Sequence, residues 1–188
     1  MERSFETALV DQCAPTLAGV KPANLFRFAP GELEITRRSA EEWDRTLAPM
    51  GIRVSILKEC SRTGASMVYV YRKDWVSRIL SDQETRGFLE KMGYRPAGAQ
   101  EMLEQLSRRL CLEQDYPHEI GVFLGYPLTD VIGFIENRGW NYTCCGCWKA
   151  YGDPEAAQRC FDRYRACTAL YKRMYAQGVS IVRLAVAA

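Results

Sequence analysis

The sequence predicts an α+β protein in which a mixed or antiparallel sheet of about five strands is covered by six or seven helices. Two short runs rich in β-branched residues, 52–57 and 67–71, are joined by a linker too short for a parallel crossover. Amphipathic helical patterns lie on both sides of this hairpin, and the longest of them begins at Pro154. The aliphatic run 179–186 predicts a terminal strand that joins the sheet.

The N-terminal third alternates between helical and irregular patterns. An apolar pattern from Phe5 favours a short first helix, and an irregular segment is expected from Cys13, where Pro and Gly residues follow. Residues 25–28 begin a strand. Ser39 then starts a capping-box motif, so the next helix is expected to begin there and to end before the following hairpin.

Three further helical patterns follow the hairpin, at residues 75–80, 84–92 and 102–110. Each carries apolar residues at helical spacing, and a break containing Pro and Gly separates the second from the third. These helices lead into the most readable part of the chain, residues 117–139, which holds its only histidine.

That segment reads PHEIGVFLGYPLTDVIGFIENRG. The apolar run 119–124 is short and is followed by Gly125, so it predicts a buried strand. Pro127 suits the first turn of a helix, which is expected to end at Gly139. His118 lies at the far end of the strand from this turn, a separation of roughly 20 Å. The histidine and the turn are therefore expected to form two rival sites.

Composition and charge limit the class of protein. The 188 residues are 47% hydrophobic, which supplies enough apolar side chains for one domain covering residues 1–188. A net charge of +2 argues against nucleic acid as the leading partner. The sequence begins without a secretory pattern and contains no uncharged run of about 18 residues, so we expect a cytoplasmic protein with no membrane partner and with reduced cysteines.

Several motifs resemble those of one bacterial family. HEIGVFLGYP is followed by DVIGFIENRG and WKAYGD, and VYVYR and LAGVKPANLF precede them. Together they resemble an uncharacterised family of small proteins from clostridia and related anaerobes, over most of the chain. The resemblance implies a cytoplasmic bacterial protein of unknown activity, and it transfers no catalytic residue, cofactor or oligomeric state.

The leading functional hypothesis is the binding of a small anionic ligand, with or without catalysis. Cationic side chains in an irregular segment or at a strand end can converge on a carboxylate or phosphate, and a helix N-terminus favours an anion. His118 is also the candidate for proton exchange. The candidate binding residues are Lys21, Asn24, Arg72, His118, Gly125 and Tyr126.

A second hypothesis concerns the thiols Cys144, Cys145 and Cys147. The first and last have the spacing of redox motifs and zinc knuckles, so a thiol-redox, iron–sulfur or zinc protein is the alternative to the anion-binding protein, for which no metal is expected. Cys160 and Cys167 are separated by about 10.5 Å of helical rise and cannot easily bind the same ion. They are expected to be core residues.

A third hypothesis is a protein-interaction module that uses exposed aromatic side chains. The candidates are Trp140, Tyr142, Trp148 and Tyr151. Cys13 is a poor candidate for a nucleophile, since the C-terminal dipole of the first helix would raise its thiol pKa.

Overall fold

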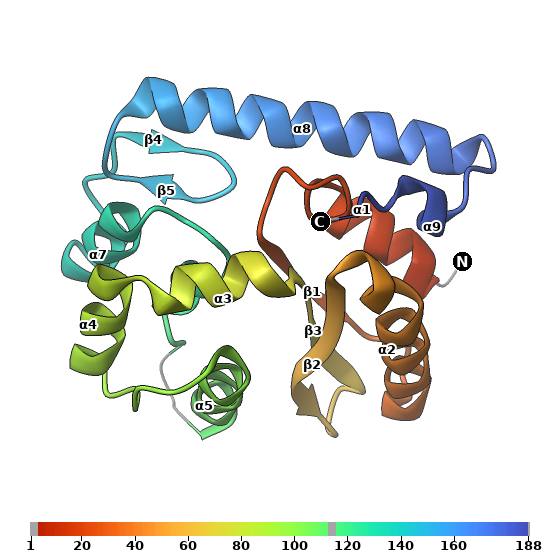
Figure 1. Ribbon diagram of the computed structural model, residues 1–188, viewed down its shortest axis with the longest axis horizontal. Coiled ribbons are helices and arrows are strands. Elements are labelled where there is room, and N and C mark those ends of the chain that lie inside the picture. Colours follow the sequence, from red (N-terminus) through yellow and green to blue (C-terminus); the bar gives the residue numbers. More distant parts are fainter. Residues whose placement is uncertain (1–3, 113–115, 188) are drawn as a thin grey trace. The chain divides into compact units, whose positions relative to one another are not determined.

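The computed structural model describes residues 4–112 and 116–187, and its chain divides into two compact units (Figure 1). The first unit contains the chain up to Val76 together with the residues from Cys167 onward, and the second unit is Ser77–Ala166. The boundaries fall within α3 (Lys73–Ser81) and α8 (Pro154–Ala176). The grouping of residues 1–188 into one domain stays a prediction.

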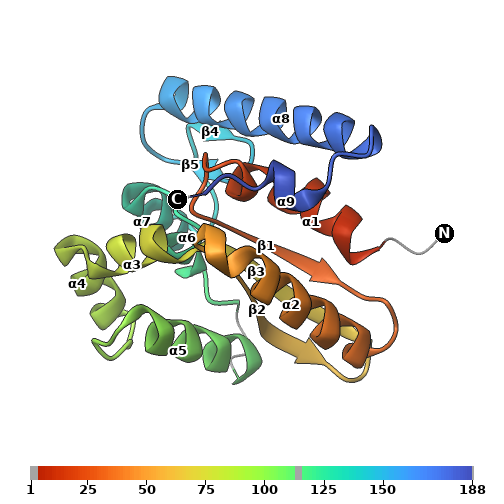
Figure 2. The same cartoon turned by 45° about the vertical axis from the view of Figure 1, so that its right-hand side comes forward.

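The first unit is built on a three-stranded antiparallel sheet of β1 (Ala23–Phe28), β2 (Ile52–Cys60) and β3 (Ala65–Arg72), as Figure 2 shows. The strand order is β1-β3-β2, so β3 is central, and nearly all of its side chains are buried. A bulge shifts the β2–β3 register between Ile56 and Lys58. The predicted hairpin and its antiparallel pairing are confirmed.

Helices α1 (Phe5–Leu17), α2 (Leu33–Leu47) and α9 (Ile181–Leu184) complete this unit. A 3-10 turn, Ala48–Met50, follows α2, and Gly51 ends it with a positive φ of 74°. Helix α1 packs on β1 and α2 packs on β2. The core is made of apolar side chains from these helices and the sheet, among them Phe5, Leu9, Phe26, Leu47, Val68, Val70, Ile181 and Leu184.

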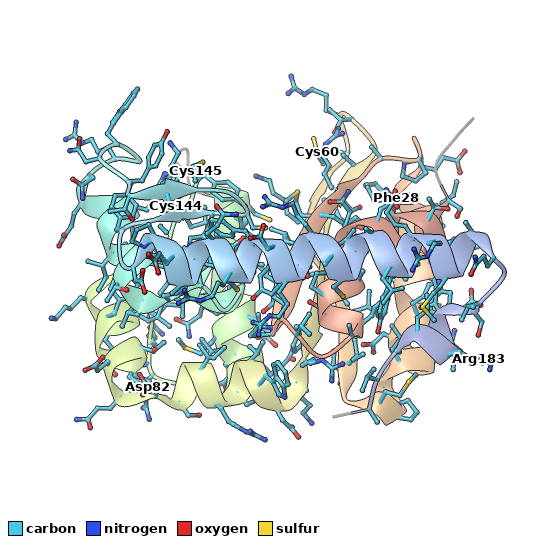
Figure 3. The ribbon with its side chains drawn as sticks, turned by 90° about the horizontal axis from the view of Figure 1, so that it is seen from above. Phe28, Cys60, Asp82, Cys144, Cys145 and Arg183 are labelled. Carbon is cyan, nitrogen blue, oxygen red and sulfur yellow. The ribbon has the colours of Figure 1, made fainter. Side chains whose placement is uncertain are left out.

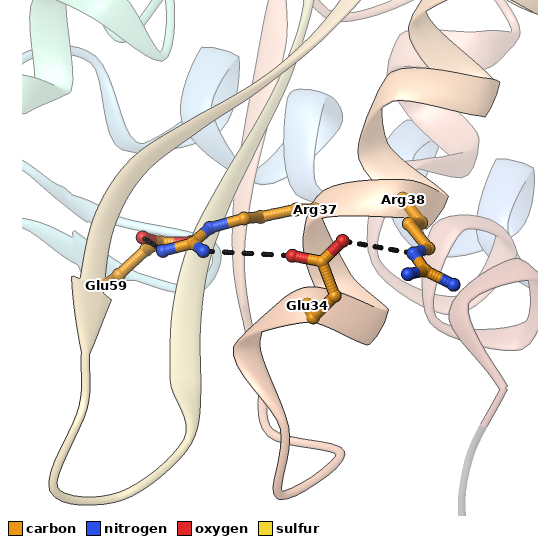
Figure 4. A network of polar contacts seen from close by, with 4 residues as sticks. All are labelled: Glu34, Arg37, Arg38 and Glu59. Atoms are coloured by element: carbon orange, nitrogen blue, oxygen red, sulfur yellow. Dashed lines mark hydrogen bonds and ion pairs between the residues drawn. The ribbon is translucent and has the colours of Figure 1, made fainter.

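Charged side chains on the surface connect α2 to β2 (Figure 4). Arg37 on α2 donates to both carboxylate oxygens of Glu59 on β2, at 2.9 and 2.6 Å. Glu34 pairs with Arg37 at 3.8 Å and with Arg38 at 3.0 Å. These groups are largely exposed, and such pairs contribute little because water and salt screen them.

The second unit contains α4 (Gln83–Lys91), α5 (Ala99–Leu112), α6 (Ile120–Phe123) and α7 (Leu128–Glu136). A short hairpin of β4 (Cys144–Cys145) and β5 (Lys149–Ala150) follows and leads into α8. The predicted helices 75–80, 84–92 and 102–110 are confirmed by α3, α4 and α5. Helices α7 and α8 are also confirmed.

Two helix boundaries were predicted wrongly. Helix α1 continues through Cys13 to Leu17 with Pro15 inside it, where an irregular segment was expected. Helix α2 begins at Leu33 rather than at the Ser39 capping box, and no side chain caps it. In both cases the packing of an apolar face on the sheet outweighs the local signal for a break or a start.

Two predicted strands are short helices instead. Residues 119–124 contain α6, and residues 179–186 contain α9, after which the chain becomes extended at Ala185. A short, continuous apolar run does not distinguish a buried strand from a buried helical turn, because it carries no periodicity. The sheet of the first unit ends with β1 and β2 at its edges, and neither run pairs with them.

The described residues thus form nine α-helices and five strands, more helices than the six or seven expected. The expectations of an α+β fold, antiparallel pairing and about five strands are confirmed. The expectation that all strands belong to a single sheet is wrong, since they form a three-stranded and a two-stranded sheet. Across residues 4–112 and 116–187, no helix has the length and apolar character needed to traverse a bilayer.

Candidate functional site

A cavity of about 360 Å³ lies in the second unit, among α6, α7 and the β4–β5 hairpin. Most of its surface is apolar, and polar groups from α7, from the hairpin and from the chain on either side of α6 reach it. The lining residues are His118, Ile120, Gly121, Tyr126, Asp130, Val131, Phe134, Cys145, Gly146, Cys147, Trp148 and Lys149. A concave apolar site with a few convergent polar groups is the usual form of a small-molecule pocket.

The connection between α6 and α7 forms one wall of this cavity. Helix α6 is a single turn that ends before Gly125, whose φ of 75° is accessible to glycine at little cost. A Cβ on Gly121 would lie 2.8 Å from Val131 and 3.2 Å from Tyr126, so only glycine lets α6 and α7 approach this closely. Pro127 then precedes α7, as the sequence predicted.

His118 and Tyr126 consequently line the same cavity. The expectation of two rival sites about 20 Å apart depended on a strand between them, and the helical turn α6 replaces that strand. Eight residues of helical or turning chain cover far less distance than the same number in a strand, since a helix rises by about 1.5 Å per residue. The histidine and Tyr126 of the turn therefore line one cavity instead of two separate ones.

Asp130 on α7 is buried and anchors the opposite wall. Its Oδ2 accepts a hydrogen bond from Nε1 of Trp148 at 2.8 Å. Its Oδ1 accepts from the backbone N–H groups of Tyr151 and Gly152, at 2.7 and 3.0 Å. One carboxylate therefore holds the chain on both sides of β5 against α7 and positions the indole ring at the cavity.

Aromatic rings form most of the lining. Tyr126 stacks on Trp148 with ring centroids 4.8 Å apart, and Trp148 meets Phe161 of α8 edge-on at 4.6 Å. The ring of His118 lies 4.8 Å from that of Phe134. Burial raises the pKa of Tyr126 to about 12, so its hydroxyl stays neutral and donates to the carbonyl of Cys147, at 3.5 Å. These rings present flat apolar faces to any bound molecule.

Lys149 supplies a positive charge to the cavity. Its Nζ donates to the carbonyl of Gly139 at 2.7 Å and lies 4.9 Å from the ring centre of Tyr142. The rings of Phe134 and Trp140 are within 6.0 Å of the same nitrogen. These contacts orient the ammonium group, which has three N–H donors and uses one of them on Gly139.

The thiols of the hairpin are divided between two environments. Cys145 and Cys147 are exposed and line the cavity, whereas Cys144 is half-buried and its Sγ lies 3.8 Å from Oε1 of Gln158 on α8. Figure 3 shows Cys144 and Cys145 on β4 beside the first turns of α8. Among the described residues, no group of three or more His, Cys, Asp and Glu side chains is arranged to hold a metal ion.

Glu119, next to His118, takes part in a separate buried network. Its carboxylate pairs with Nε of Arg109 at 2.9 Å and accepts a hydrogen bond from the hydroxyl of Tyr94 at 3.0 Å. Arg109 also donates to the carbonyl of Met92. These bonds attach α6 to α5 and to the end of α4, which fixes the position of His118 beside the cavity.

Three of the predicted ligand-binding residues lie in the first unit and do not line this cavity. Arg72 is buried and donates to the carbonyls of Thr16, Leu17 and Val186 at 2.8 to 2.9 Å. Asn24 accepts from the hydroxyl of Thr16, and Lys21 is buried. A ligand role for them stays a prediction.

Gly125 and the four aromatic candidates differ in their relation to the cavity. Gly125 shapes the α6–α7 turn without lining the cavity. Trp140 and Tyr142 are 73% and 44% exposed, whereas Trp148 and Tyr151 are half-buried and bonded to Asp130. The two halves of the proposed interaction surface therefore have different environments.

Two cysteines outside the hairpin are in environments that make their thiols unreactive. Cys13 is fully buried in α1, and burial raises the pKa of its thiol far above the usual range. Burial likewise raises the pKa of Cys167 on α8. Both changes favour the protonated, unreactive form of these side chains.

Sequence reasoning missed Asp130, Phe134 and Lys149 as parts of a site. Asp130 lies outside the apolar stripe of the predicted helix, since adjacent helical residues do not share a face, so the pattern carried no signal for its burial. Lys149 and Trp148 begin the WKAYGD motif, whose role depends on a two-residue strand that no periodicity reveals.

The fold and the cavity define an α+β protein with a small, aromatic-lined pocket in its second unit. The chain belongs to the family described as "Protein of unknown function (DUF3793)", whose family model matches residues 9–185. A search of the curated proteins and a search of the solved structures each found no match.

Proposed function

We propose that this protein binds a small molecule with a flat, mainly apolar body and one anionic group, in the cavity of the second unit. The observation that carries the proposal is that His118, Tyr126 and Lys149 line one cavity of about 360 Å³ together with Phe134 and Trp148. Ligand pockets of about 300–1,000 Å³ with aromatic walls bury most of the surface of molecules of this size.

The charge of the lining supports an anionic group. Lys149 has N–H donors beyond the one bonded to Gly139, and His118 is exposed beside the same cavity. The negative charge of Asp130 is compensated by three N–H donors, so it opposes an anion less than a bare carboxylate would. The ammonium group of Lys149 therefore dominates the electrostatic interaction with a ligand.

The flat, apolar body of the ligand follows from the walls. The stacked pair Tyr126 and Trp148 and the tilted pair His118 and Phe134 present ring faces, which favour aromatic partners in offset or edge-to-face contact. The proposal retains His118 and Tyr126 from the sequence and adds Lys149. Proton exchange by His118, the cytoplasmic location and the clostridial origin stay predictions.

The binding proposal is tested with a pair of probes that differ in one charge, indole-3-acetate and indole-3-acetamide. Calorimetry and thermal unfolding should show tighter binding and greater stabilisation by the carboxylate. In Lys149→Met, affinity for the carboxylate should fall roughly tenfold or more, the loss expected for one charge-assisted hydrogen bond, while affinity for the amide changes little.

A matched control is Lys91→Met on the exposed end of α4, which should leave both affinities unchanged. If neither indole probe nor a wider panel of aromatic carboxylates, sulfonates and mononucleotides raises the melting temperature, the proposal is wrong. An equal loss in Lys149→Met and Lys91→Met would assign the effect to net charge rather than to this site.

A further inference from the structure

The thiols of the β4–β5 hairpin are divided between α8 and the cavity. Cys144 packs on the buried cluster of Ala150, Ala157 and Phe161. A Cβ on Gly146 would lie only 2.3 Å from the ring of Phe161 on α8. Cys144 therefore faces α8 and Cys145, the next residue of β4, faces the other side, whereas Gly146 lies close to Phe161 and also lines the cavity.

Cys145 and Cys147 both line the cavity, which Cys144 does not. The two residues are exposed, so a small molecule in solution can reach their thiols. All eight cysteines lie in the described residues and are present as thiols. The motif Cys-Gly-Cys thus places two accessible thiols on one face of one hairpin.

The spacing of these residues suits a disulfide. Two Cα atoms separated by one residue are at most about 7 Å apart, and closer where the chain turns. The chain does turn here, because the N–H of Gly146 donates to the carbonyl of Trp148 at 3.0 Å. Disulfides join residues with Cα atoms about 4.4–6.8 Å apart, so closure needs little movement of the backbone.

The spacing from Cys144 to Cys147 is that of the familiar redox motif, but the structure argues against that pair. The side chain of Cys144 is directed toward Gln158 and the α8 cluster. A bond to Cys145 or Cys147 would need Cys144 to leave that packing and to turn to the other face of the strand.

We propose that Cys145 and Cys147 form a redox-active dithiol that exchanges with small-molecule disulfides such as oxidised glutathione. The thiolate of one cysteine attacks a glutathione sulfur, which forms a mixed disulfide and releases one glutathione thiol. The second cysteine then attacks the protein sulfur of that mixed disulfide and releases the other glutathione. One S–S bond breaks in glutathione disulfide, one forms in the protein, and both protons pass to the released thiols.

This dithiol does not depend on the proposed anionic ligand, since the exchange needs only accessible thiols and a disulfide. It also differs from a metal site, because its chemistry uses two sulfurs and no ion. The nearest cation along the hairpin is Lys149, which pairs with Cys145 across β4 and β5. Opposed side chains in such a pair lie on the same face of the sheet.

The test uses the folded protein in glutathione buffers of graded redox ratio, followed by an acid quench, alkylation of thiols and peptide mass spectrometry. Trypsin releases residues 139–149, a peptide that contains all three hairpin cysteines. In the wild type, oxidation should protect two of these thiols from alkylation, so the peptide should carry one alkyl group instead of three, and the two protected sulfurs should lack their two hydrogen atoms.

Three serine variants separate the possible pairs. Cys144→Ser should still lose two hydrogen atoms on oxidation, whereas Cys145→Ser and Cys147→Ser should not. The inference is overturned if the wild type stays fully alkylated at the most oxidising ratio, if Cys144→Ser abolishes the change, or if a glutathione adduct persists without ring closure. Unchanged melting temperatures would show that each variant is folded.

Discussion

Asp130 on α7 and Trp148, next to β5, are joined by a hydrogen bond of 2.8 Å between the carboxylate and the indole N–H. The second oxygen of Asp130 accepts from two backbone N–H groups just after β5. The chain before and after this strand is therefore tied to one buried side chain. The wall of the cavity depends on that attachment.

Asp130→Asn should destabilise the second unit. An amide has one oxygen and an NH₂ group that cannot accept, so at least one donor loses its partner, at a cost of about 1–3 kcal/mol. The free energy of unfolding, measured in urea with tryptophan fluorescence as the signal, gives this loss. Asp153→Asn is the control, because Asp153 accepts from Glu155 N–H at the start of α8, and Asn replaces Asp there at little cost. Equal effects of the two changes would contradict the anchoring role of Asp130.

Two helical glycines should respond in opposite ways to alanine. Gly87 on α4 has no atom within 4 Å of a built Cβ, so Gly87→Ala should stabilise the protein by up to about 1 kcal/mol through helix propensity. Gly133 on α7 would place its Cβ 2.5 Å from the ring of Tyr151, so Gly133→Ala should destabilise it by about 1–3 kcal/mol. The melting temperatures of the two variants test this difference. A rise in both would show that Tyr151 does not pack on Gly133.

The buried and the exposed ion pairs should differ in energy. Glu119 is 2% exposed, and Glu119→Gln removes the negative charge of a buried ion pair with Arg109, at a cost of about 3 kcal/mol. Glu59→Gln breaks the exposed pair with Arg37 shown in Figure 4 and should have a much smaller effect. Chemical unfolding of the two variants provides the measurement. A larger loss of unfolding free energy in Glu59→Gln than in Glu119→Gln would show that the exposed pair, and not the buried one, stabilises the fold.

The contribution of Tyr126 to stability should change with pH only in the alkaline range. Burial, together with Cys147 and Tyr116, raises its pKa in the folded protein from 10.0 to about 12. The folded state thus favours the neutral phenol, and the resulting stabilisation is complete below pH 10 and lost as pH rises toward 12. The difference in absorbance at about 295 nm between wild type and Tyr126→Phe should titrate near the upper end of this range. A titration near pH 10 would show that the phenol is solvated.

Much of the helical architecture was accessible from pattern alone. The helices α3, α4, α5, α7 and α8 carry apolar stripes long enough to show a period of 3.6 residues, and the β2–β3 hairpin shows strong β propensity around a short turn. The runs 119–124 and 179–186 were predicted wrongly because four-residue helices are shorter than any helical period can reveal. The hairpin of β4 and β5 has two residues in each strand and was missed for the same reason.

The site shows the same division. Local chemistry identified His118, Tyr126, Cys145 and Cys147 as candidates, because an imidazole and clustered thiols are rare and chemically distinctive groups in this chain. It did not reveal that all four line one cavity, nor that Cys144 faces away from it. Arg72 seemed equally suited to a ligand, yet its donors bind three backbone carbonyls.

Residue type and spacing were sufficient for the fold class, the long helices and the chemical identity of the groups that could act. The position of His118 beside Tyr126, the buried bond from Asp130 to Trp148 and the separation of Cys144 from its two neighbours required the folded chain. Periodicity arises from contacts within one element and is visible in a short window of sequence. A cavity arises from contacts between distant elements, whose mutual packing is a property of the whole second unit.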